Sequence, residues 1–161
     1  MKKERTAFIL ITSDRAHSGD RPDETAPKLK DLLQEYHFEV TKIQVVPDDL
    51  SEITDQLIQA ADRENIDLII TSGGTGPGPR DVTVEATHQI LDKEIPGLAE
   101  YMRFKSSEIV KSALISRAKT GIRNNSLIIN LPGSPKGALE NLGFIADVLH
   151  HTLDMMEGKG H

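Results

Sequence analysis

Short apolar runs alternate with amphipathic segments along this chain, and no other feature of the sequence restricts the fold as strongly. Residues 6–12, 38–46, 67–72 and 126–131 have the length and composition of buried strands. Near-continuous apolar strands separated by helices are typical of a parallel sheet that is covered on both faces. The sequence therefore predicts an α/β fold, a three-layer sandwich in which helices flank a mostly parallel sheet.

Helical periodicity accounts for most of the remaining chain. We expect helices near Pro27, after Ser51 as an N-cap, over residues 84–91, from Pro96 onward, and after the turn at 132–137. Residues 13–25 are predicted to form a polar loop. With 161 residues and no internal repeat or linker, we expect one domain over residues 1–161, with a frayed polar tail at 157–161.

The composition argues against several functional classes. The chain has 19 Lys and Arg against 25 Asp and Glu, a net charge of −6 that disfavours nucleic acid or an anionic membrane as the main partner. The absence of cysteine excludes disulfides, thiolate metal sites and a cysteine nucleophile. Residues 7–11 are too short an apolar run for a signal peptide or a membrane span. We therefore expect a cytoplasmic protein.

The candidate functional loops all follow predicted strands. In open parallel sheets, ligands bind beyond the carboxyl ends of the strands. Those ends carry Ser13 and Asp14, then Asp48, the glycine-rich segment 73–78, and the turn at 132–134. The sequence thus predicts that the functional residues meet at one edge of the sheet.

The glycine-rich segment is the strongest of these signals. Four glycines lie within residues 73–78, between a strand and a helix, where glycine lets backbone N–H groups approach an anion. The segment is not a G-x-G-x-x-G fingerprint, because Pro79 occupies the last glycine position, and it is not a P-loop, because Gly78 precedes Pro79 and Arg80. Its prolines favour a stiff anion cradle, and the alternative is a plain turn without a ligand.

Two aspartates are placed to take part in phosphate chemistry. Asp48 and Asp81 follow neighbouring strands, where two carboxylates can share a Mg²⁺ ion that bridges phosphates. Each also has a structural alternative, since Asp81 can cap the following helix and Asp48 can be a turn residue.

Other polar residues are more ambiguous. The turn at 132–136 offers Ser134 as a second anion ligand or as a helix entry. Arg80, Arg117 and Arg123 can pair with phosphate or, as is commoner, with surface acids. The histidines show no metal spacing.

Together these residues resemble the molybdopterin-binding family of molybdenum cofactor biosynthesis, which includes bacterial molybdopterin adenylyltransferases and the first domain of gephyrin. The resemblance covers essentially the whole chain. It is specific in the order and spacing of several motifs, which lie at residues 13–15, 46–48, 71–76, 80–83, 114–117, 120–123 and 131–136.

The resemblance implies a mostly parallel α/β sandwich that forms a homotrimer. It implies an enzyme that uses Mg²⁺ and ATP as co-substrate to adenylylate the phosphate of its substrate, molybdopterin, releasing pyrophosphate before molybdate insertion. By motif, Asp48 and Asp81 are the catalytic and metal residues. The implied substrate-binding residues are Ser13, Asp14, Gly73, Gly74, Thr75, Gly76, Ser116, Gly133 and Ser134. Because the second domain of the fused eukaryotic proteins is missing, we expect handover to a separate molybdate-inserting partner.

Two further functions remain open at this stage. One is a carrier of the same fold that binds and delivers molybdopterin without chemistry, and the other is a nucleotide-binding regulator. The carboxylate pair Asp48 and Asp81 favours the enzyme, because a pure anion carrier gains nothing from negative charge beside its phosphate.

Overall fold

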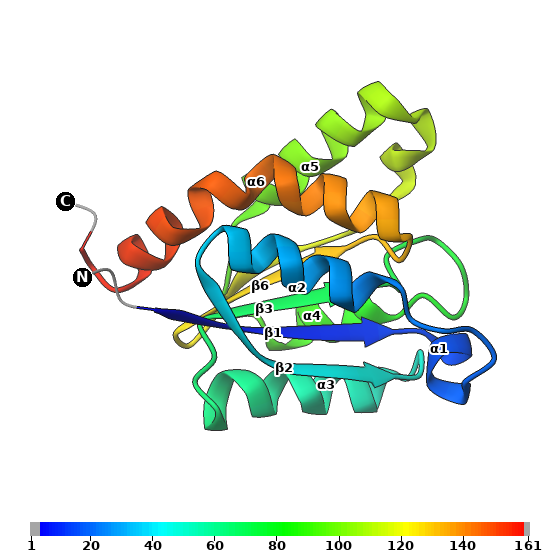
Figure 1. Cartoon of the computed structure of the whole chain (residues 1–161), viewed down its shortest axis with the longest axis horizontal. Coiled ribbons are helices and arrows are strands. Elements are labelled where there is room, and N and C mark those ends of the chain that lie inside the picture. Colours follow the sequence, from blue (N-terminus) through cyan, green and yellow to red (C-terminus); the bar gives the residue numbers. More distant parts are fainter. Residues whose placement is uncertain (1–3, 160–161) are drawn as a thin grey trace.

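The sheet determines where every candidate residue lies. In the computed structural model, which describes residues 4–159, six strands form one sheet in the order β2-β1-β3-β6-β5-β4 (Figure 1). The strands β1 (Arg5–Thr12), β2 (Phe38–Val46), β3 (Leu68–Ser72) and β6 (Ser126–Leu131) are parallel. β5 (Thr120–Arg123) is antiparallel to β6, and β4 (Lys93–Glu94) is antiparallel to β5. The predicted α/β fold with a mostly parallel sheet is confirmed.

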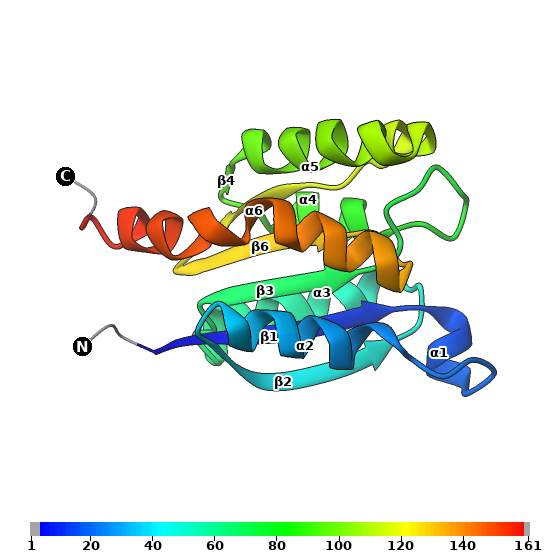
Figure 2. The same ribbon diagram turned by 45° about the horizontal axis from the view of Figure 1, so that its top comes forward.

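Helices cover both faces of this sheet, as Figures 1 and 2 show. One face carries α2 (Thr25–Glu35), α5 (Pro96–Ile109) and α6 (Pro135–Met156), and the other carries α3 (Leu50–Ile58) and α4 (Thr83–Ile90). A π-helical turn, η1 (Gln59–Arg63), extends α3, and a 3-10 segment, η2 (Lys111–Ile115), follows α5. Among the helices within residues 4–159, none has the length and apolar character needed to cross a membrane.

The central strands β1, β3 and β6 are largely apolar on both sides because a separate core lies on each face of the sheet. In β1, Ala7, Ile9 and Ile11 pack into the core beneath α2 and α6, whereas Phe8 and Leu10 pack into the core beneath α3 and α4. Side chains alternate between the faces of a strand, so a strand that is covered on both faces has no polar side. This is the physical reason for the unbroken apolar runs.

Three local predictions differ from the structure. Part of the predicted loop at 13–25 forms a short helix, α1 (Asp14–Ser18), whose first turn is capped by the Ser13 hydroxyl. The predicted N-cap Ser51 is wrong, because Asp49 accepts the hydrogen bond from the Glu52 amide and Ser51 lies inside α3. The strands β4 and β5 were not predicted, since each is too short to show a period.

The chain ends of the described region are tied together. The Arg5 side chain is 4% exposed, and it donates to Asp154 at 2.7 Å and to Glu157, just beyond the end of α6. Hydrogen bonds from Lys159 and Arg5 lower the pKa of Glu157 to about 2. The predicted frayed tail, residues 157–161, thus begins with Glu157, which holds α6 to β1. Residues 160 and 161 lie outside the part of the chain that the structure describes.

Candidate active site

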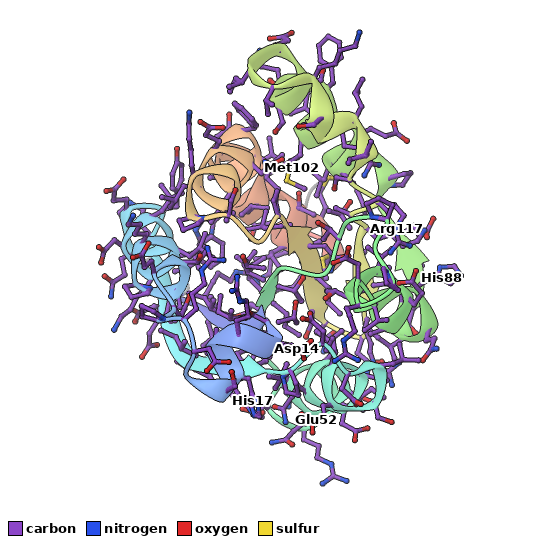
Figure 3. All side chains as sticks on the ribbon, turned by 90° about the vertical axis from the view of Figure 1, so that its right-hand side faces the viewer. Asp14, His17, Glu52, His88, Met102 and Arg117 are labelled. Atoms are coloured by element: carbon purple, nitrogen blue, oxygen red, sulfur yellow. The ribbon has the colours of Figure 1, made fainter. Side chains whose placement is uncertain are left out.

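The carboxyl ends of the parallel strands meet at one edge of the sheet, which faces the viewer in Figure 3. A polar pocket of about 330 Å³ lies there, between the glycine-rich segment, α1 and the start of α6. Most of the predicted site residues line it, namely Ser13, Asp48, Gly73, Gly74, Asp81, Gly133 and Ser134. The predicted convergence of these loops on one edge is therefore present in the structure.

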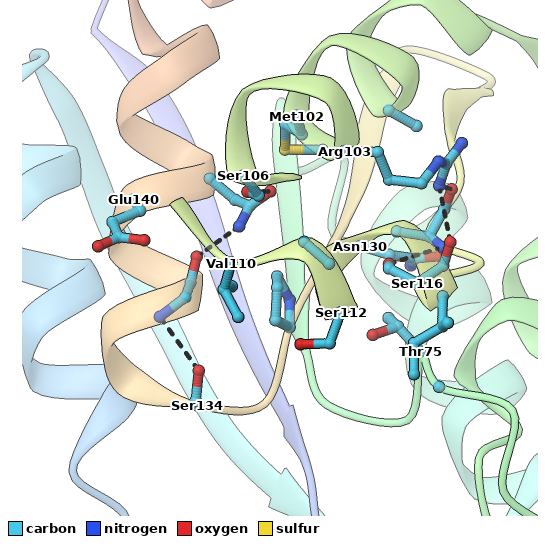
Figure 4. Close-up of a pocket in the computed structure, with 18 residues that line it drawn as sticks. Thr75, Met102, Arg103, Ser106, Val110, Ser112, Ser116, Asn130, Ser134 and Glu140 are labelled. Carbon is cyan, nitrogen blue, oxygen red and sulfur yellow. Dashed lines mark hydrogen bonds between the residues drawn. The ribbon is translucent and has the colours of Figure 1, made fainter. Parts of the chain in front are cut away.

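A second pocket of about 260 Å³ adjoins the first (Figure 4). It lies between α5, η2 and the start of α6, and its walls are largely apolar, with Met102, Val110 and Ile115 among them. Three of the four remaining predicted residues line this pocket: Thr75, Gly76 and Ser116. The fourth, Asp14, lines neither pocket and contacts the site through Asp48. Ser134 lines both pockets, so the site has a polar half and an apolar half with a shared border.

The glycine-rich segment between these pockets is held in one conformation. Gly73 and Gly74 have φ of +110° and +66°, and the Gly73 amide donates to the Leu131 carbonyl at 3.1 Å. The Gly74 carbonyl accepts from the Thr83 amide at 3.2 Å, which joins the segment to α4. A Cβ on Gly74 would lie 2.1 Å from Thr83 Oγ1. Both conformation and space therefore require glycine here.

Three successive backbone amides remain available to an anion. In the part of the chain that the structure describes, the N–H groups of Gly74, Thr75 and Gly76 make no hydrogen bond to protein. Free amides after a strand and close to a helix start form a concavity that binds phosphate. The segment thus has the donors expected of an anion cradle.

The two predicted metal residues differ in their surroundings. Asp81 Oδ2 accepts from the Gly78 amide at 2.9 Å, and the residue before α4 is Val82, which caps the helix with no side-chain hydrogen bond. The alternative that Asp81 caps α4 is therefore wrong. Asp48 exchanges two hydrogen bonds with Asp14: its Oδ2 accepts from the Asp14 amide at 3.1 Å, and its own amide donates to Asp14 Oδ1 at 3.0 Å.

These carboxylates concentrate negative charge in the polar pocket. Burial raises the pKa of Asp48, and the charges of Asp14 and Asp81 raise it further, although the hydrogen bond from the Asp14 amide and the charge of Arg80 oppose this. The pKa of Asp14 is lowered, first by the hydrogen bond from the Asp48 amide and then by Arg80. The fork of Arg80 donates to both Asp14 oxygens, at 3.0 and 2.9 Å. Asp48 is thus a carboxylate whose charge is incompletely compensated.

The donor set fits a cation that substrate helps to bind. Within residues 4–159, no group of three or more His, Cys, Asp or Glu side chains is arranged to hold a metal ion. Mg²⁺ in phosphoryl transfer needs only one or two carboxylates, with substrate oxygens completing its shell. Asp48 and Asp81 are two carboxylates of the polar pocket that could serve as such ligands, and a cation beside Asp48 would oppose the burial and the acidic neighbours that raise its pKa.

The sequence did not single out Asn130, which supports the floor of the site. It is fully buried in β6, where its Nδ2 donates to Thr71 and Thr87 hydroxyls, each at 2.9 Å. Its Oδ1 accepts from the Lys119 amide at 3.1 Å. A polar residue inside the apolar run 127–131 was the available signal, because a buried amide requires partners.

The three arginines pair with acids, which was the commoner of the two alternatives. Arg80 pairs with Asp14, Arg117 with Glu85, and Arg123 with Asp62.

Comparison with known proteins agrees with this geometry. Residues 8–151 match the model of a family described as a probable molybdopterin binding domain. The chain belongs to this family. It is 39% identical over 153 residues to a molybdopterin adenylyltransferase of Helicobacter pylori, covering 94% of this chain and 87% of the relative. It is 40% identical over 142 residues to a molybdopterin adenylyltransferase of Escherichia coli, covering 86% and 72% of the two chains.

A solved structure shows the same fold. The crystal structure of the molybdopterin biosynthesis enzyme MoaB from Thermus thermophilus superposes on this molybdopterin-binding domain with a TM-score of 0.91. The two chains are 45% identical, and the match covers 96% of this chain and 98% of the other. The family expected from the sequence motifs is thereby confirmed.

Replacement of Gly74 by Ala should destabilise this domain. The new methyl group would meet Thr83 at a backbone conformation that disfavours side chains, so we expect the free energy of unfolding to fall by about 2 kcal/mol or more. Gly143 of α6 has open space around it, and G143A should instead raise the free energy of unfolding by roughly 1 kcal/mol. Denaturant unfolding of both variants measures this, and equal stability would contradict a sterically fixed loop.

Proposed function

We propose that this chain is a molybdopterin adenylyltransferase. It would transfer the adenylyl group of ATP to the phosphate of molybdopterin and release pyrophosphate, as a step that precedes molybdate insertion in molybdenum cofactor biosynthesis. The proposal depends on one observation: three free amides at 74–76 lie on the border between the apolar pocket and the polar pocket that holds Asp48 and Asp81. The names of the relatives support it.

The two halves of the site suit the two substrates. A pterin is a flat ring system. The largely apolar pocket under α5 offers it apolar walls, and Ser116, which also lines this pocket, adds a hydroxyl group. The polar pocket carries the carboxylates, and it suits the triphosphate of ATP with its cation. The loop amides and Ser134 lie on the border, where the phosphates of both substrates would meet.

The chemistry needs no protein nucleophile. An oxygen of the molybdopterin phosphate attacks the α-phosphorus of ATP, a P–O bond forms, and the bond to the β-phosphate breaks as pyrophosphate leaves. The amides of residues 74–76 donate to phosphate oxygens as charge shifts among them. Asp48 and Asp81 would hold Mg²⁺, which supplies charge neutralisation to the phosphates. The fixed loop keeps the donors in place, so no reorganisation is required during the reaction.

A non-catalytic molybdopterin carrier of the same fold is the second candidate. Such a carrier would bind a phosphate beside two carboxylates, at the cost of charge repulsion. Burial and acidic neighbours already raise the pKa of the half-buried Asp48, and a bound phosphate would add to the repulsion on its charge. An enzyme that brings a cation with its nucleotide relieves it, and this difference favours the enzyme.

Replacement of either carboxylate should remove turnover without removing the fold. We expect D48N and D81N to lower the rate of pyrophosphate release from Mg²⁺, ATP and molybdopterin by roughly 100-fold or more. D48N should be as stable as the wild type at pH 7, because it removes an incompletely compensated charge. D62N is the matched control, since Asp62 pairs with Arg123 away from either pocket, and its turnover should be unchanged.

A pyrophosphate signal no higher than the no-enzyme control, from wild-type protein and competent substrate, would refute the adenylyltransferase. Tight pterin binding that is indifferent to ATP and to D81N would then identify the carrier.

We also propose that the chain forms a homotrimer through α5 and η2. Six large apolar side chains there are 48–61% exposed, and such groups mark contacts between proteins. They are Tyr101, Phe104, Ile109, Val110, Leu114 and Ile115. The expected cytoplasmic location and handover to a molybdate-inserting protein belong to the same proposal, and both rest on the family resemblance.

Introduction of a charge into this apolar surface should dissociate the trimer. Phe104 is 61% exposed, so F104E should keep the fold while sedimentation velocity shows a shift from trimer to monomer. Met155 is 47% exposed at the end of α6, and M155E should remain trimeric. A monomeric wild type, or a trimeric F104E, would contradict this interface.

A further inference from the structure

Arg117 links the two ends of the loop that separates the pockets. Its Nε donates to the Gly76 carbonyl at 2.9 Å, and its Nη2 donates to the Asp81 carbonyl at 3.1 Å. Glu85 of α4 accepts from the same guanidinium. The Arg117 amide also donates to the Thr75 carbonyl at 2.9 Å. One residue thus fixes the segment that begins at the anion cradle and ends at a carboxylate of the polar pocket.

The segment that carries Arg117 is itself fastened to α5. Arg103 donates to the Ser116 carbonyl at 3.3 Å and to the Ala118 carbonyl at 2.9 Å. Ser116 and Ala118 both line the apolar pocket. A displacement of this segment would therefore move the Arg117 guanidinium, and with it the loop from Gly76 to Asp81.

The chemistry of the contact explains why an arginine is needed. A guanidinium presents several N–H donors in a rigid plane, so it can bond two carbonyls and a carboxylate at once. An ammonium group at the same position carries the charge without that fork. The hydrogen bonds from Arg117 are also the main reason why the pKa of Glu85 is lowered, so the anchoring acid stays ionised.

We propose that Arg117 is a positioning residue that couples the apolar pocket to Asp81. It holds Asp81 where the reaction needs a carboxylate. When a ligand fills the apolar pocket beside Ser116 and displaces residues 116–118, Arg117 passes that displacement on to the loop from Gly76 to Asp81. The assignment of substrates to the pockets rests on the proposed function, whereas the mechanical link between residues 116–118 and 76–81 does not. By linkage, a ligand in one pocket should then change the affinity of the other.

Arg123 provides a matched control. It also pairs with an acid through its guanidinium, Asp62, and donates to a helix-end carbonyl, that of Ile90, at 2.9 Å. It lines neither of the two pockets of the site. R123Q therefore removes an arginine, an ion pair and a carbonyl contact, as R117Q does, but it removes no contact to the loop from Gly76 to Asp81.

Hydrogen exchange on the substrate-free protein tests the link directly. We expect the amides of Gly78 and Asp81, which are hydrogen-bonded within the loop, to exchange about tenfold faster or more in R117K and R117Q than in wild type, because the loop loses its bonds to the guanidinium. In R123Q the exchange of this loop should be unchanged. Protection of the Gly78 and Asp81 amides that is the same in R117Q and in wild type would overturn the proposal.

Kinetics and binding then separate positioning from general stability. In R117K and R117Q, kcat should fall by about 10- to 100-fold, with the KM for ATP changed much less, while thermal stability matches that of R123Q. Full activity of R117K would overturn the proposal, because charge alone would then suffice.

The failure of the proposed function would look different from the failure of this coupling. Should the wild type release no pyrophosphate, adenylylation is refuted, and the coupling is tested by the affinity for molybdopterin with and without a non-hydrolysable ATP analogue. In wild type and R123Q, the affinity for molybdopterin should change when the ATP analogue is bound. In R117Q it should not change. Independent binding in the wild type would overturn the coupling.

Discussion

The fastening of the glycine-rich segment is the constraint on which the rest of the site depends. Gly73 is bonded to β6, Gly74 is bonded to the first residue of α4, and Arg117 holds the two ends of the following loop. The bonds to residues 74–76 use their carbonyls as acceptors and leave the amides of these residues available. A phosphate that arrives there meets donors already in position, which is the condition for strong electrostatic stabilisation.

The polar pocket carries charge that the fold alone does not explain. Asp48 lies half-buried beside Asp14 and Asp81, and this raises its pKa, so its ionised form weakens the folded state at neutral pH. Arrangements of this kind persist where they serve function, since selection tolerates a local loss of stability for activity. A nucleotide with its cation would supply the missing positive charge. This is why we propose that the glycine segment and the acidic pair act together on phosphates.

The sequence predicted those parts of the molecule that follow from local patterns. Largely apolar runs at 6–12, 67–72 and 126–131, and apolar residues interspersed with polar ones at 38–46, indicated four parallel strands, and the rule for strand ends placed Ser13, Asp48 and Gly73 at one edge. Contacts between distant segments could not be predicted, because periodicity carries no information on partners. Arg117 looked like one of several surface arginines, and its bond to Gly76 joins residues 41 positions apart.

Two further differences have the same origin. Asp81 satisfied the sequence pattern of a helix cap, but the helix begins after Val82, so the carboxylate bonds back to the Gly78 amide instead. Asn130 lay inside an apolar strand, and only the fold brings Thr71 and Thr87 to its side chain. Sequence patterns thus predicted which loops meet at one edge of the sheet, whereas tertiary packing decided which side chains contact one another there.

A crystal structure of this chain with adenylylated molybdopterin would show whether the loop amides hold the phosphates of the substrates. We expect phosphate oxygens within hydrogen-bonding distance of the amides of residues 74–76, the adenylyl group on the side of Asp48 and Asp81, and the pterin in the pocket beneath α5. Phosphates bound elsewhere, with the amides of residues 74–76 unoccupied, would contradict this expectation.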